Sequence, residues 1–370
     1  MRGLGNTVLR LTAIRRAGLA AMADGDGRLT AMTGFGPNPG ALDARIYVPD
    51  DLPANAPLVV VLHGCTQNAA VYDKGSGWSK LADRHGFALL YPEQRRANNH
   101  NLCFNWYAPA DARRGDGEAR SIARMIENMV AEHRLDASRI FVTGLSAGGA
   151  MTAVMLAAYP DLFAGGAIIA GLPFASANTL PEALERMRGS GGPSRIELAK
   201  RAKAAAPQRG AVPTLSVWHG TRDMIVDAAN AVVIVDQWRD LHGLGETRSL
   251  VDRVDGHRRE VWHDGDGRAV IEKYDIEGMG HGTPLATRGN EPCGTAGPHM
   301  LEANICSTSR IAESWGLTGT VATKRAAPAK PIVVAAAEPP RTRAIPVTPR
   351  RPTGVGAVIE DALRAAGLMR

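Results

Sequence analysis

The segment from Ile140 to Gly149 constrains the fold of this chain more than any other. It is a short apolar run that ends in Gly-Leu-Ser-Ala-Gly, and a helical pattern from Ala150 to Tyr159 follows at once. Gly144 and Gly148 carry no side chain where a sharp turn brings backbone segments too close for a Cβ. The segment predicts a strand, a tight turn and a helix, with Ser146 at the apex.

The position of Ser146 predicts a nucleophile. A helix N-terminus offers free N–H groups and a positive dipole, which favour developing negative charge. Strained strand–turn–helix corners expose a serine hydroxyl above the sheet. The alternative is a purely structural turn, because the Gly-x-Ser-x-Gly pattern also arises by chance in a chain with 41 glycines.

Strands that alternate with helices surround this turn. Such alternation predicts an α/β fold with a mostly parallel central sheet and helices on both faces. Residues 173–211 interrupt the rhythm, and we interpret them as a small insertion over the site. The predicted strands are Leu42–Val48, Leu58–Leu62, Phe87–Tyr91, Ala167–Ala170, Thr214–Trp218 and Ala269–Ile276, with a probable hairpin at 248–263.

The composition predicts four segments along the chain. Residues 1–34 are expected to form an N-terminal helix and linker, and residues 35–317 the catalytic domain. Residues 318–353 are rich in Pro, Ala and Arg and contain few large apolar side chains, so we expect a disordered linker. Residues 354–370 are compatible with a short C-terminal helix, either a docking peptide or a fraying end.

The charge and hydropathy of the chain exclude several classes of function. The formal charge of +6 is modest, and the basic residues form no patch interleaved with aromatics, so nucleic-acid binding is not expected. Apolar runs stay short of the roughly 20 residues that a transmembrane helix needs. Arginines interrupt the first residues, so no clear signal peptide is recognised.

Four cysteines bear on the cellular compartment. Cys65 and Cys103 form an early pair in the sequence, and Cys293 and Cys306 a late one. The absence of a C-x-x-C motif argues against a zinc site, and two disulfides are the preferred interpretation over buried thiols. Disulfides indicate an extracellular or periplasmic location, whereas the missing signal favours the cytoplasm. The two indications stay in conflict.

A serine nucleophile requires a base, and the base requires an orienting acid. The chain order serine, acid, histidine is the one that α/β-hydrolases use. Asp223 follows the strand Thr214–Trp218 after a glycine-containing loop and is the favoured acid. Asp227 is the rival acid, but it lies nearer to the next predicted helix. A solvated loop carboxylate is the remaining interpretation.

His281 is the favoured base. It follows the strand Ala269–Ile276 and lies between two glycines, in a loop able to aim an imidazole. His257 and His263 are rivals on the probable hairpin, and His299 is a third. The alternative for His281 is a structural loop histidine.

Acyl transfer also needs donors for an oxyanion. One is expected from the residue after the nucleophile, here the N–H of Ala147. The second is expected from the loop after an earlier strand, where the N–H of Cys65 is the best candidate. His63 is expected to shape this loop, and a tight structural turn is the alternative.

These residues form a constellation of five motifs that resembles a known family. The chain is similar to the poly(3-hydroxybutyrate) depolymerase family of α/β-hydrolase esterases, which is related to feruloyl and acetyl-xylan esterases. The resemblance covers about residues 35–317, with the oxyanion loop before the serine. The motifs, in order, are Leu62–Gln67, Cys103–Trp106, Gly144–Gly149, Trp218–Asp223 and Gly280-His281.

The resemblance implies further features. It implies disulfides Cys65–Cys103 and Cys293–Cys306, and it places Trp106 beside the acyl-binding cleft, with His63 near the substrate. A core tryptophan is the alternative for Trp106. The chain departs from the polymer depolymerases that it resembles, because it shows neither a clear signal peptide nor a tail long enough for a polymer-binding domain.

The sequence therefore predicts a serine esterase that acts on short-chain polyhydroxyalkanoate polymer, its oligomers or small esters. No cofactor and no metal are required by this chemistry. A feruloyl or acetyl-xylan esterase is the nearest rival, and a peptidase on the same fold is disfavoured. A non-catalytic binding protein is the rival from another class. The oligomeric state and the export route are not determined by the sequence.

Overall fold

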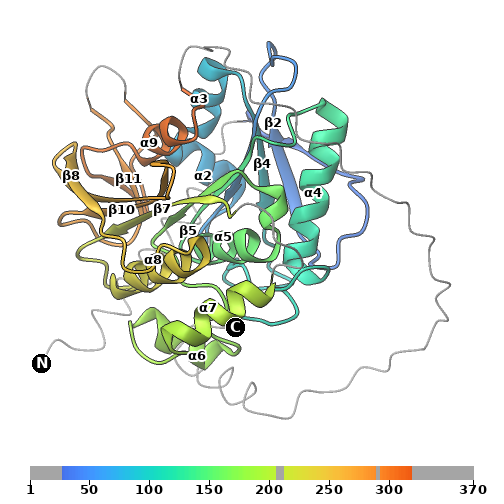
Figure 1. Ribbon diagram of the computed structural model, residues 1–370. Coiled ribbons are helices and arrows are strands. Elements are labelled where there is room, and N and C mark those ends of the chain that lie inside the picture. Colours follow the sequence, from blue (N-terminus) through green and yellow to red (C-terminus); the bar gives the residue numbers. More distant parts are fainter. Residues whose placement is uncertain (1–26, 206–211, 289–291, 319–370) are drawn as a thin grey trace, which may run out of the picture. The chain divides into compact units, whose positions relative to one another are not determined.

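One large sheet forms the centre of the part that the structure describes (Figure 1). The computed structural model describes residues 27–205, 212–288 and 292–318. Within them, ten strands form this sheet. Their order across it is β1 (Thr30–Ala31), β2 (Asp43–Tyr47), β4 (Ala88–Glu93), β3 (Leu58–Leu62), β5 (Ile140–Leu145), β6 (Gly165–Ile169), β7 (Thr214–Gly220), β10 (Ala269–Ile276), β9 (His257–His263) and β8 (Leu250–Val254).

The middle of the sheet is parallel and its edges are antiparallel. The strands from β4 to β10 in this order pair in parallel, whereas β1 and β2 on one side and β9 and β8 on the other pair antiparallel. Ligand sites of such sheets lie at the carboxyl ends of the parallel strands. The predicted α/β-hydrolase arrangement, a mostly parallel sheet with helices on both faces, is therefore the observed one.

Helices cover both faces of the sheet because the central strands are apolar on both sides. On one face, Leu58, Val60 and Leu62 belong to the apolar cluster that contains the helices α4 and α5. On the other face, Val59 and Val61 belong to a second cluster. The first layer comprises α4 (Gly117–His133), α5 (Ala147–Ala158), α6 (Leu180–Met187), α7 (Arg195–Ala205) and α8 (Ala229–His242), and the second comprises α2 (Ala69–Ser76), α3 (Trp78–His85) and α9 (Ser307–Ser314).

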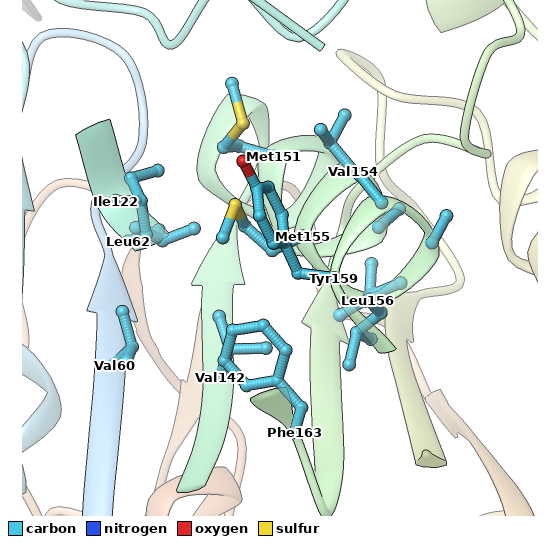
Figure 2. Packing of buried hydrophobic residues seen from close by; sticks show 14 of the residues in the cluster. Val60, Leu62, Ile122, Val142, Met151, Val154, Met155, Leu156, Tyr159 and Phe163 are labelled. Atoms are coloured by element: carbon cyan, nitrogen blue, oxygen red, sulfur yellow. The ribbon is translucent and has the colours of Figure 1, made fainter. Parts of the chain in front are cut away.

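Helix α5 is the most deeply buried helix of the described chain, since each of its residues is buried. Figure 2 shows Met151 and Met155 from this helix, which belong to the same apolar cluster as Val60 and Val142 from the strands. Burying an apolar side chain of this size contributes roughly 1.5–3 kcal/mol. The helix that begins at the serine turn is thus anchored in the core along its whole length.

The predicted insertion, residues 173–211, contains helices α6 and α7. It packs beside the loop after β7, which carries Asp223. Leu198 of α7 accepts a hydrogen bond from Gln237 Nε2 of α8 at 3.0 Å. Met187 at the end of α6 accepts one from the Asp227 N–H at 2.7 Å. The insertion therefore lies next to the loop after β7.

The structure adds elements that the sequence pattern did not predict. A two-stranded parallel sheet forms from β11 (Thr283–Leu285) and β12 (Met300–Glu302). Its strands have three residues each, too few for a period-2 alternation to be recognised. A 3₁₀ turn, Pro160–Leu162, follows α5. The predicted N-terminal helix, Pro/Ala/Arg-rich linker and C-terminal helix lie outside the described residues, and the proposed division of the chain stays a prediction.

The hairpin β8–β9 occupies one end of the sheet. Its turn is Asp255-Gly256, and β9 pairs antiparallel with β10. Because β10 pairs directly with β7, the hairpin lies outside both of these strands although it lies between them in the sequence. The loops after β7 and β10 therefore start side by side.

Candidate active site

The turn after β5 holds Ser146 in a strained conformation. Its φ is 59° and its ψ is −117°, a region that costs a non-glycine residue of order 1–3 kcal/mol. A Cβ on Gly144 would lie 2.4 Å from the carbonyl oxygen of Gly148, and a Cβ on Gly148 would lie 2.3 Å from that of Leu62. The turn therefore needs both glycines, as the sequence pattern predicts.

Backbone contacts fix the apex of this turn. The N–H of Ser146 donates to the carbonyl of Ile169 on β6 at 2.9 Å, and its carbonyl accepts from Ala150 in the first turn of α5. The side chain does not cap the helix, and the residue is 9% exposed. The hydroxyl is thus free for chemistry at the N-terminus of a buried helix.

Asp223 is held as an ionised acceptor. Its Oδ1 accepts from the N–H groups of Ile225 and Val226, both at 2.9 Å. Its Oδ2 accepts from His281 Nδ1 at 2.7 Å and lies 3.4 Å from His219 Nε2. Burial alone would raise the pKa of this carboxyl, but hydrogen bonds with His219 and His281 hold the pKa well below its usual range.

The loop after β10 brings His281 to this carboxylate. Gly220 at the end of β7 allows the approach, because a Cβ there would lie 2.3 Å from the carbonyl oxygen of Met279. The N–H of Arg222 donates to that same carbonyl at 2.9 Å. His281 in turn meets the ring of His299 edge-on at 5.6 Å, and its carbonyl accepts from His299 Nδ1. The structure thus brings together Asp223 and His281, which are 58 residues apart.

The rival residues have other partners. Asp227 is exposed, and its Oδ1 accepts from the N–H of Ala229 in the first turn of α8. His257 donates from Nε2 to the carbonyl of Ala303 at 2.7 Å and accepts at Nδ1 from the N–H of Glu277. These contacts stabilise the turn before α8 and anchor the hairpin, respectively.

The Ser146 hydroxyl is not hydrogen-bonded to His281 in the described part of the chain. Hydrogen bonds between a nucleophile and its base are often long before substrate binds and tighten in the reactive complex. The catalytic pairing of these two side chains is therefore part of the proposal below.

Two backbone N–H groups are available for an oxyanion. Leu62 pairs with Gly144 in the sheet, so the loops that leave β3 and β5 start side by side. Within the described residues, neither the N–H of Cys65 nor that of Ala147 donates a hydrogen bond. Cys65 forms a disulfide with Cys103, the pairing that the family resemblance implies.

The side chain of His63 stabilises the loop that carries Cys65. Its Nε2 accepts from the N–H of Gln94 at 3.1 Å, so Nδ1 carries the hydrogen and donates to the carbonyl of Gly64 at 2.8 Å. Burial lowers the pKa of His63 to about 4. A neutral, fully hydrogen-bonded ring is suited to shaping the loop, and its predicted place beside the substrate stays a prediction.

Trp106 is largely buried. It is 6% exposed, belongs to the apolar cluster of the α4 and α5 layer and meets Tyr107 edge-on at 5.7 Å. This packing is typical of the core alternative. Its contribution to a substrate cleft is not tested by these contacts.

His219 is a site residue that the sequence did not single out by itself. Its side chain is 1% exposed, and Nε2 donates to the carbonyl of Val226 at 2.9 Å beside Asp223. Its Nδ1 is buried without a partner among the described residues. The available signal was its place at the end of an apolar strand, four residues before the acid, within the motif Trp218–Asp223.

The other two cysteines form a disulfide, and the described residues contain no candidate metal site. Cys293 and Cys306 form the second disulfide, with a sequence separation of 13. In the described ranges, no cluster of three or more His, Cys, Asp or Glu side chains could hold a metal ion. No helix in the same ranges is both long and apolar enough to span a bilayer.

The sheet order, the strained serine turn and the acid–histidine pair define an α/β-hydrolase, and comparison with known proteins gives its family. The family model described as "Esterase PHB depolymerase" matches residues 42–263. This chain therefore belongs to the esterase PHB depolymerase family, and it is a carboxylic ester hydrolase of the serine type.

Individual relatives agree with this assignment. The chain is 45% identical to "Poly(3-hydroxyalkanoate) depolymerase C" of Paucimonas lemoignei over 293 residues, which cover 79% of this chain and 70% of that protein. It is 31% identical to "Feruloyl esterase B" of Talaromyces funiculosus, over 69% of this chain and 73% of that protein. The acetyl xylan esterase from Aspergillus awamori matches in structure with a TM-score of 0.65 at 24% identity, over 79% of this chain and all of that one, which supports the fold.

Proposed function

We propose that this esterase cleaves the ester bonds of poly(3-hydroxyalkanoate), most directly short-chain 3-hydroxybutyrate polymer or its oligomers, with Ser146, His281 and Asp223 as catalytic residues. The hydrogen bond of 2.7 Å between His281 and Asp223 is the observation that carries the proposed triad. The identity of 45% with a relative named as a poly(3-hydroxyalkanoate) depolymerase supports the substrate class.

The proposed mechanism assigns one role to each of these groups. Ser146 Oγ attacks the ester carbonyl while His281 Nε2 takes the serine proton, and Asp223 stabilises the imidazolium through Nδ1–H. The N–H groups of Cys65 and Ala147 bind the oxyanion. The histidine then protonates the leaving alcohol, and water, activated by the same ring, releases the acid from the acyl-enzyme.

The closest alternative is a feruloyl or acetyl-xylan esterase with the same machinery. The identity of 31% with a feruloyl esterase over most of both chains favours it as second candidate. The purified protein should be tested with hydroxybutyrate oligomers, a polyhydroxybutyrate film, methyl ferulate and acetylated xylan. A higher kcat/KM for methyl ferulate or acetylated xylan than for the oligomers would overturn the proposed substrate class.

The proposed nucleophile is tested by Ser146→Ala. We expect this variant to fold normally, to escape labelling by a fluorophosphonate probe and to lose at least about 10³-fold in kcat. Circular dichroism and the melting temperature control for folding. Wild-type turnover in this variant would refute the assignment, and an unlabelled, inactive wild type would indicate a non-catalytic protein on the esterase scaffold.

We further propose that the protein works in an oxidising compartment, outside the cytoplasm. The two disulfides support this location, because such bonds persist where thiols are not kept reduced. Fractionation of cells that produce the protein, with thiol alkylation before lysis, tests it. Alkylated cysteines in the cytoplasmic fraction would contradict the proposal.

A further inference from the structure

Glu118 is a buried carboxylate that the proposed chemistry does not use. It lies in the first turn of α4, and the residue is 1% exposed. Its Oε1 accepts from Gln94 Nε2 at 2.6 Å and from Asn105 Nδ2 at 2.8 Å, and its Oε2 accepts from the Asn105 N–H at 2.8 Å. None of the ion pairs among the described residues involves Glu118. A buried carboxyl without a cation is costly to ionise, and the three hydrogen bonds that it accepts favour its ionised form.

Gln94 connects this carboxylate to the loop that carries Cys65. The Gln94 side chain donates to the Cys103 carbonyl at 3.0 Å as well as to Glu118. The backbone N–H of the same residue donates to His63 Nε2 at 3.1 Å. Since Cys103 is disulfide-bonded to Cys65, Gln94 reaches the oxyanion loop from two sides.

Asn105 connects the carboxylate of Glu118 to Asn99, in the segment that precedes Cys103. Its Oδ1 accepts from Asn99 Nδ2 at 3.0 Å, and Asn99 Oδ1 accepts from the Cys103 N–H at 3.3 Å. Both hydrogen bonds from Asn105 to Glu118 hold this segment against α4. Glu118 therefore holds Asn105 directly and Asn99 through Asn105. These two residues lie on either side of Cys103 in the sequence.

We propose that Glu118 is a positioning residue, which fixes the Cys65 N–H in the direction of the developing oxyanion through Gln94, Asn105 and the Cys65–Cys103 disulfide. The inference deepens the proposed function, because it rests on Cys65 as an oxyanion donor. Glu118 touches neither substrate nor nucleophile. Removal of one oxyanion donor typically costs 10²–10³ in kcat, so partial misalignment of the donor should cost about tenfold.

The protonation state of Glu118 sets the conditions of the test. Its pKa is raised to about 8, because the effect of burial outweighs the hydrogen bonds from Asn105 and Gln94, which lower it. Asp111 is the nearby carboxyl, and its Oδ1 accepts from the Glu118 N–H. Tyr107, whose pKa is also raised, faces both carboxyls. Raising the pH from 7 to 9 therefore increases the ionised fraction of the Glu118 carboxyl.

The experiment compares Glu118→Gln with wild type on p-nitrophenyl acetate, with spontaneous hydrolysis subtracted. The amide turns one acceptor into a donor that faces other N–H groups. At pH 9 we expect kcat to fall about tenfold with KM changed less than about twofold, and at pH 7 a smaller fall. Inhibition by a trifluoromethyl ketone, whose adduct places an oxyanion at the same donors, should weaken in parallel with kcat/KM.

A matched control separates positioning from stability. Asp73 is also a buried carboxylate, 5% exposed, which accepts from the N–H and hydroxyl of Ser79 and from the hydroxyl of Tyr91. Asp73→Asn should lower the melting temperature without changing kcat or the inhibition constant of the ketone. If both variants lose kcat in proportion to their loss of stability, the positioning role is refuted.

A second variant covers the case in which Glu118→Gln does not fold. Gln94→Met keeps the volume and the backbone N–H to His63 but removes the side-chain donor to Glu118 and Cys103. We expect a smaller fall in kcat, of about three- to fivefold, again with little change in KM. Unchanged kcat and ketone affinity would overturn the proposal. A wild type without esterase activity would instead refute the proposed function on which the inference rests.

Discussion

The two sides of the candidate active site are fixed by different means. The oxyanion side, around Cys65, is held by side chains: a disulfide, the neutral ring of His63 and the buried carboxylate of Glu118. The acid–histidine side is held by close backbone contact, with Gly220 packed under the Met279 carbonyl. Activity should therefore fall when a polar or covalent contact is removed on the oxyanion side. On the acid–histidine side, it should fall when a single methyl group is added.

The largest effect is expected from Gly220→Ala. The new Cβ would lie 2.3 Å from the Met279 carbonyl oxygen and 2.5 Å from that of Gly280, and both are backbone atoms that must move. A displacement of about 1 Å can cost 10² in rate, so we expect kcat to fall at least about 100-fold. Overpacking should also cost about 1–3 kcal/mol or more in the free energy of unfolding.

Gly280→Ala is the matched control in the same loop. A Cβ on Gly280 meets no atom within 4 Å, and the residue lacks a positive φ. Urea unfolding and steady-state kinetics of both variants test the comparison. Equal losses in the two variants would show that loop flexibility, and not backbone contact, governs this side.

An intermediate effect is expected from removal of the Cys65–Cys103 disulfide by a double substitution to alanine. The disulfide closes a loop with a sequence separation of 38, and the chain-entropy model gives about 4 kcal/mol of stabilisation. Because this bond holds the proposed oxyanion donor Cys65, we also expect kcat to fall about tenfold.

The Cys293–Cys306 disulfide provides the comparison. Its separation is 13, so its removal should cost about 3 kcal/mol. We expect kcat to remain within twofold below the melting temperature, since neither Cys293 nor Cys306 carries a proposed oxyanion donor. A fall in kcat of similar size in both double variants would show that the Cys65–Cys103 disulfide has no particular role in holding the proposed oxyanion donor.

The smallest effect is expected from His219, a side chain that lies beside Asp223 on the backbone-held side. His219→Leu removes the N–H beside Asp223, whereas His219→Gln keeps a donor. We expect kcat/KM to fall about three- to tenfold in the leucine variant and less in the glutamine variant.

The pH dependence of the free energy of unfolding tests the interaction between His219 and Asp223. The pKa of Asp223 is lowered in the folded protein, so the stabilisation is present above the ordinary pKa of about 4 and is lost as pH falls toward the folded value. The difference in unfolding free energy between wild type and His219→Leu should therefore be constant near pH 7 and narrow below about pH 4. A difference independent of pH would indicate a packing effect alone.

The sequence predicted those features whose cause is local. Gly144 and Gly148 reveal the serine turn because the Gly-x-Ser-x-Gly pattern lies within five residues, although the atoms that exclude a Cβ at Gly148 belong to Leu62 and His63. Apolar runs predicted most of the central strands, and Leu58–Leu62 and Ala269–Ile276 agree with the structure at both ends. The predicted fold class is confirmed. Cysteine pairing required the family resemblance, because four cysteines allow three pairings.

The features that the sequence did not predict depend on long-range contacts. Glu118 looks like an ordinary residue of an amphipathic helix, and only the approach of Gln94 and Asn105 shows its role. His219 could be placed on a strand, but its distance to Asp223 depends on the conformation of the loop between them. The short strand Thr283–Leu285 exists because Met300–Glu302 returns beside it, which no local pattern encodes.

The position of the β8–β9 hairpin has a practical consequence for engineering. Asp255 and Gly256 form its turn at the edge of the sheet, while β10 pairs directly with β7. Additional residues grafted at this turn would lengthen the chain between acid and base without changing the distance between them. The hairpin tip is therefore a suitable attachment point for a binding module or an affinity tag, if the ion pair between Asp255 and Arg310 of α9 is kept.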